Sequence, residues 1–87
     1  MPVSNLIETA RAIHKSYRAK AEKHPVEVIG HEAAHSFNKL LDESKSKYPD
    51  NQLISKMQPV TPSQTQLAGL LAKLVLLEDF LKAEQSA

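Results

Sequence analysis

The chain has 87 residues and no cysteine, which allows one domain and excludes both a disulfide scaffold and a thiolate zinc site. Apolar residues make up 41% and charged residues 24%, as is typical of a folded globular domain rather than a disordered tail. Eleven lysine and arginine residues against ten aspartate and glutamate residues give a net charge of +1, without the basic excess of a dedicated nucleic-acid binder.

The first predicted helix covers residues 5–23. Asn5 and Glu8 have the spacing of a capping box, which marks a helix start. Apolar residues then recur three and four positions apart on one side, at Leu6, Ala10, Ile13, Tyr17 and Ala21. His24 precedes Pro25, and a residue before proline is disfavoured in the α region, so we expect the helix to end there.

The second predicted helix covers residues 25–48 and forms an antiparallel hairpin with the first. Pro25 suits the first turn of a helix, where its missing N–H group has no partner to lose. Apolar residues again share one side, among them Ile29, Ala33, Phe37 and Leu40. The Tyr48–Asn51 stretch contains helix breakers, so residues 49–60 are predicted to form a loop with a short amphipathic turn.

The third predicted helix covers residues 62–84. Thr61, Pro62 and Gln64 supply a hydroxyl cap, a proline in the first turn and a complete capping box. No alternating β-branched run occurs, so a sheet is not expected. The sequence therefore predicts a single all-α domain over residues 1–87, a small three-helix bundle that packs as an oligomer.

The third helix carries the strongest pattern in the chain. Five leucines follow heptad spacing, at Leu67, Leu70, Leu74, Leu77 and Leu81. A second apolar strip, which includes Leu76 and Phe80, lies on nearly the opposite side. Because two other short helices cover only one side well, we expect these seven residues to contribute to contacts with a second copy. A homodimer is the default, since two-fold closure is the commonest symmetry.

A short motif, HEAAH over residues 31–35, introduces a different hypothesis. On a helix, His31 and His35 share one face and have the spacing of zinc ligands, with Glu32 placed as general base on a zinc-bound water. The surrounding residues 28–37 resemble the helix signature of the zincin metallopeptidases. That resemblance implies ligand roles for the two histidines and a catalytic role for the glutamate.

The rest of the chain departs from the zincin pattern. The metzincin extension of the motif has glycine and histidine where Asn38 and Leu41 stand. A catalytic zinc normally has three protein ligands, and the candidates for the third are Glu78 and Asp79 on the last helix. Zinc is therefore kept as an alternative cofactor, and no cofactor is the leading expectation.

A third hypothesis concerns the basic first helix. Arg11, Lys15 and Arg18 share one face at a spacing suited to phosphate contacts. Glu8 and Glu22 flank that face and favour salt bridges along the helix instead. No recognition-helix turn, aromatic platform or glycine-rich phosphate loop accompanies these cations.

These patterns rank the functions. The leading expectation is a non-catalytic interaction module that acts as a homo-oligomer and presents the polar faces of its first two helices to another protein. The alternatives are a miniature zinc hydrolase and a nucleic-acid-binding protein. The longest apolar run, Leu74–Leu77, is too short to span a membrane, and residues 1–15 lack the apolar stretch of a secretory signal. We therefore expect a cytoplasmic protein.

Overall fold

The computed structural model describes residues 3–86, and every regular element in this range is a helix. The four helices are α1 (Val3–Lys23), α2 (His31–Lys47), α3 (Gln52–Ser55) and α4 (Leu67–Ser86). Over those residues the β-type pairing is limited to one isolated bridge between Val28 and Gln66. The prediction of an all-helical protein with three long helices is confirmed.

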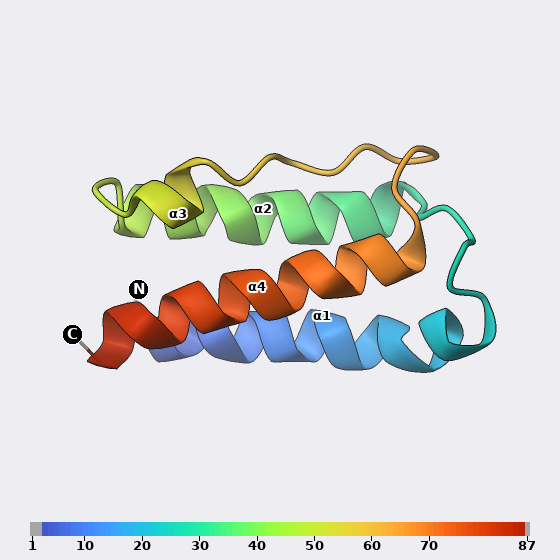
Figure 1. Ribbon diagram of the computed structural model, residues 1–87, viewed down its shortest axis with the longest axis horizontal. Coiled ribbons are helices and arrows are strands. Elements are labelled where there is room, and N and C mark those ends of the chain that lie inside the picture. Colours follow the sequence, from blue (N-terminus) through green and yellow to red (C-terminus); the bar gives the residue numbers. More distant parts are fainter. Residues whose placement is uncertain (1–2, 87) are drawn as a thin grey trace.

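The three long helices lie side by side along the long axis of the molecule (Figure 1). α1 runs antiparallel to α2, as predicted, and also antiparallel to α4. α2 and α4 therefore point in the same direction, and residues 56–66 connect them by running back alongside α2. The most extensive packing joins α1 to α4, the first helix to the last.

The second helix begins at His31 instead of Pro25, which corrects the predicted range. Residues 24–27 form a turn, in which the N–H of Glu27 donates to the carbonyl of His24 at 3.1 Å. The backbone of Ile29 is then paired with a distant segment: its N–H donates to the carbonyl of Thr65 at 2.8 Å and its carbonyl accepts from the N–H of Ser63 at 3.0 Å. The Ile29 side chain is buried. This non-local pairing outweighs the helical pattern of residues 25–30.

The last helix begins at Leu67 instead of Pro62. Thr61 starts a turn rather than a helix, and its carbonyl accepts from the N–H groups of Gln64 and Thr65, both at 3.2 Å. Ser63 has a φ of +68°, in the left-handed region that a right-handed helix excludes. The chain thereby turns from the connecting segment towards α4, and the capping-box residues form this turn.

The predicted short turn between the long helices is confirmed as α3. Asn51 caps it, since its Oδ1 accepts from the N–H of Ile54 at 3.0 Å, while its Nδ2 donates to Oε1 of Glu84 at 2.6 Å. Ile54 is buried and Met57 is nearly so, whereas Leu53 points outward and is 60% exposed. The turn is amphipathic, and its inner side closes the core over α2 and α4.

The core is apolar and fills the space between the long helices. Its largest fully buried side chains come from α1, α2 and α4 and include Leu6, Phe37, Leu40, Leu41, Leu74 and Leu77. Ser44 is the one fully buried polar side chain among the described residues, and its hydroxyl donates to the carbonyl of Leu40 at 2.8 Å. The buried hydroxyl is thus satisfied within its own helix.

Candidate functional site

The five heptad leucines of α4 point into the core of the chain. Their side chains are 0–2% exposed and are enclosed by the other helices. Leucines used in this way stabilise the monomer fold by apolar burial. Of the seven residues predicted to contact a second copy, Leu76 and Phe80 are the two that reach the surface.

The opposite side of α4 is an exposed and mostly apolar surface. We define the α4 outer face by the exposed residues within about 100° of arc on this side, which are Ala68, Ala72, Val75, Leu76, Asp79 and Ala83. Val75 and Leu76 are 48% and 46% exposed. A surface helix normally places charged residues on its solvent side, whereas this face carries one, Asp79.

A shallow hollow between α3 and α4 extends the α4 outer face. Leu53, Met57, Leu76 and Phe80 form its apolar floor and walls, and Lys56 and Lys73 stand at its edge. Leu53 is the most exposed apolar side chain of this region. The apolar surface therefore continues from α4 onto α3, with lysines at its border.

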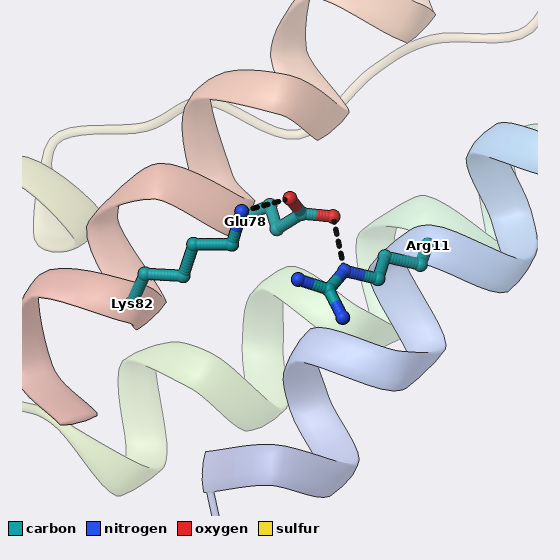
Figure 2. Close-up of polar contacts among 3 residues, drawn as sticks. All are labelled: Arg11, Glu78 and Lys82. Atoms are coloured by element: carbon teal, nitrogen blue, oxygen red, sulfur yellow. Dashed lines mark ion pairs between the residues drawn. The ribbon is translucent and has the colours of Figure 1, made fainter.

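The basic side of α1 is tied to α4 by an ion-pair network (Figure 2). Nε of Arg11 lies 3.3 Å from Oε1 of Glu78, and Nζ of Lys82 lies 2.9 Å from Oε2 of the same carboxylate. The hydrogen bond from Lys82 is the main cause that lowers the pKa of Glu78 below its ordinary value of 4.5, and the charge of Arg11 acts in the same direction. Both carboxylate oxygens are thus paired with a cation, and one terminal guanidinium nitrogen of Arg11 points away from Glu78.

A second hollow lies between α1 and α4 beside this network. We call it the α1–α4 hollow, and it is lined by Arg11, His14, Lys15, Arg18, Val75 and Glu78. Lys15 and Arg18 are exposed and His14 is half-buried. Nε of Arg18 lies 3.9 Å from Oε1 of Glu22, an exposed pair of small energetic weight. The three cations predicted as polyanion contacts are therefore brought together at one depression.

The HEAAH motif occupies the first two turns of α2. His31 is the first helical residue, Gly30 is the N-cap, and the side chains of His31, Glu32 and His35 are all exposed. Over residues 3–86 no three histidine, aspartate or glutamate side chains are grouped so that they could hold a metal ion. Glu78, a candidate third ligand, is engaged with Arg11 and Lys82.

Two features of this surface were missed by sequence reasoning. The first is the ion pair between Glu78 and Arg11, which joins α4 to α1. The sequence indicated only the other half of the network, because Glu78 and Lys82 are four residues apart on one helix. Val75 and His14 line the α1–α4 hollow, and no motif in the sequence assigned either residue to a site. Both features depend on how α1 packs against α4.

Comparisons with models of known protein families, with curated proteins and with solved structures find no match to this chain. None of the helices within residues 3–86 has the length and apolar character needed to cross a membrane.

Proposed function

We propose that this protein is a non-catalytic interaction module that works as a homodimer, with the α4 outer face as the contact between the two copies. The observation that carries the proposal is the exposure of Val75 and Leu76 on a helix that carries apolar residues both on the leucine row and on the opposite side. A helix with two apolar sides is normally buried on both of them, whereas the chain itself fully buries only the leucine row.

The α4 outer face favours a second copy of the same chain as its occupant. A two-fold antiparallel crossing at Leu76 brings residues that lie equally far before and after it to the same level. Ala72 of one copy then comes level with Phe80 of the other, a small side chain beside a large one. Lys73 likewise comes level with Asp79, and these opposite charges help to fix the register.

The size of the surface sets the expected strength of association. α4 has 20 residues and is therefore about 30 Å long. One helix face of this length buries less area than the roughly 800 Å² per partner of a standard interface. Neighbouring residues such as Leu53 must therefore contribute to the contact. We expect a reversible monomer–dimer equilibrium rather than a permanent dimer.

In such a dimer the polar sides of α1 and α2 stay free for another macromolecule. We place the module in the cytoplasm as part of the same proposal, because small domains of oxidising compartments commonly rely on disulfides and this chain has no cysteine.

Sedimentation velocity over a concentration series tests the proposal. The wild-type chain is expected to shift from monomer to dimer as its concentration rises to tens of micromolar. Leu76→Glu places a charge at the centre of the contact and is expected to leave a folded monomer, because Leu76 is half-exposed in the single chain.

A matched control is Val26→Glu, the same kind of change at a 71% exposed valine in the connection between α1 and α2. It is expected to dimerise like the wild type. Exchange of Lys73 and Asp79 in one double variant tests the register, since it is expected to dimerise better than either single charge reversal. A wild-type chain that stays monomeric at tens of micromolar refutes the proposal. An equal loss of dimer formation in the Leu76→Glu and Val26→Glu variants also refutes it.

A further inference from the structure

We propose that the α1–α4 hollow binds the phosphate groups of a single-stranded nucleic acid. Val75 belongs both to this hollow and to the α4 outer face, so the inference concerns the monomer of the proposed monomer–dimer equilibrium. It begins with the distribution of charge, because the net charge of +1 for the whole chain conceals a concentration of cations at one place.

The cations of the hollow form a row. Arg11, Lys15 and Arg18 stand at successive turns of α1 and span about 10 Å along its axis. A compact anion such as inorganic phosphate would engage one end of this row, whereas a chain of phosphates can engage all three side chains. The arrangement therefore fits a linear polyanion.

Arg11 is held in a position suited to phosphate. Its Nε atom is used by Glu78 at 3.3 Å, which orients the guanidinium and leaves a terminal nitrogen directed away from that carboxylate (Figure 2). Guanidinium groups bind phosphate through two parallel N–H donors, and a group that is already oriented loses less entropy on binding. Lys82, at 2.9 Å from Glu78, neutralises the carboxylate that would otherwise repel a phosphate.

The walls of the hollow are suited to bases. Val75 is 48% exposed and the imidazole of His14 is half-buried at the edge, so an apolar surface and a flat ring adjoin the cations. Proteins that bind single strands combine a positively charged track with side chains on which bases stack. An anionic membrane would in addition require exposed apolar residues on α1 for insertion, but Leu6, Ile7 and Ile13 of this helix are buried.

Fluorescence anisotropy with labelled single-stranded DNA and RNA of the same base order tests the inference. If three phosphates are neutralised, the logarithm of the affinity falls with the logarithm of the salt concentration with a slope of about −2, or about 20-fold between 50 and 200 mM salt. Lys15→Gln is expected to reduce this slope by about 0.7, and Lys15→Glu combined with Arg18→Glu to abolish binding. Circular dichroism checks that these exposed substitutions leave the helices intact.

Lys39→Gln is the matched control for Lys15→Gln, because Lys39 is an exposed lysine in the middle of α2 and outside the hollow. It is expected to retain most of the affinity. The inference is overturned if neither DNA nor RNA binds at 50 mM salt, or if the Lys15 and Lys39 variants lose the same affinity. It is also overturned if a polyglutamate peptide or anionic vesicles bind more tightly than the oligonucleotides.

Discussion

The side-chain amide of Asn38 forms two hydrogen bonds with the backbone of Val60. Its Nδ2 donates to the Val60 carbonyl at 2.9 Å, and its Oδ1 accepts from the Val60 N–H at 2.8 Å. The two residues are 22 positions apart, and the pairing fixes the middle of the 56–66 connection against α2. One helical side chain thus takes the place of a neighbouring strand for the backbone of an extended segment.

Replacement of Asn38 by alanine is expected to lower the free energy of unfolding by about 1–3 kcal/mol, because both backbone groups of a buried residue lose their partner. Urea unfolding measures the change, and hydrogen exchange at the Val60 amide locates it. Ser46→Ala, at an exposed position of α2, serves as control, and equal stability of the Asn38→Ala and control variants would contradict the role of this pairing.

Gly30 offers a site for strengthening α2. It is the N-cap, with φ of −89° and ψ of −177°, no side chain to cap the helix, and no heavy atom within 4 Å of an added Cβ. The free energy of unfolding of Gly30→Asp is expected to exceed that of Gly30→Ala by about 0.5–2 kcal/mol. The aspartate side chain accepts a hydrogen bond from the free N–H groups of the first turn, and its negative charge is stabilised by the positive end of the helix dipole. Both variants lose the flexibility of glycine in the unfolded chain, so their difference isolates the cap. Thermal unfolding of the two proteins side by side provides the measurement, and no difference would mean that the first turn of α2 is capped by other means.

Glu78 makes stability depend on pH. Its pKa is lowered in the folded state, mainly by the hydrogen bond from Lys82, so the stabilisation is complete above the ordinary glutamate value of 4.5 and is lost as the pH falls through the folded value. Glu78→Gln is expected to be less stable than the wild type at pH 6 and to approach it at pH 3. Because the network is partly exposed, we expect a difference within about 1 kcal/mol that shrinks in high salt. Chemical unfolding at both pH values tests this, with Glu32→Gln, an exposed glutamate of α2, as the comparison. A Glu78→Gln variant whose deficit is the same at both pH values would show that the charge of Glu78 is not the cause.

Adjacent leucines of α4 are expected to respond very differently to truncation. Leu77 is 0% exposed, so Leu77→Ala leaves a cavity and is expected to cost about 2–5 kcal/mol of unfolding free energy. Leu76 is 46% exposed, and Leu76→Ala is expected to cost less than about 1 kcal/mol when measured on dilute, monomeric protein. Urea unfolding of both variants gives the comparison. Similar losses would show that the two sides of α4 are buried to a similar extent.

The sequence predicted those parts of the fold that depend on local pattern. α1 ends at Lys23 as the following His24–Pro25 pair requires, and α3 forms where the amphipathic turn was expected. The starts of α2 and α4 were placed too early, and both errors have one cause: residues around Ile29 and Thr65 pair with each other across the chain. Helical periodicity and capping residues report on neighbours in sequence and carry no information about such a partner.

The same division holds for the candidate surfaces. Heptad spacing correctly identified one continuous face of α4, but it did not show whether that face meets α1 or another molecule. The spacing of Arg11, Lys15 and Arg18 likewise placed three cations on one side of a helix. That Val75 and Glu78 complete a hollow with them follows from the packing of α1 on α4, which the sequence did not predict.

The pairing of α1 with α4 also affects how the chain folds during its synthesis. A ribosome releases α1 before α4, the helix against which α1 packs most extensively, and Leu6, Ile7 and Ile13 of α1 are buried in the folded domain. Until α4 has emerged, these side chains remain available to chaperones or to other nascent chains. We therefore expect the domain to acquire its structure only after α4 has left the ribosome.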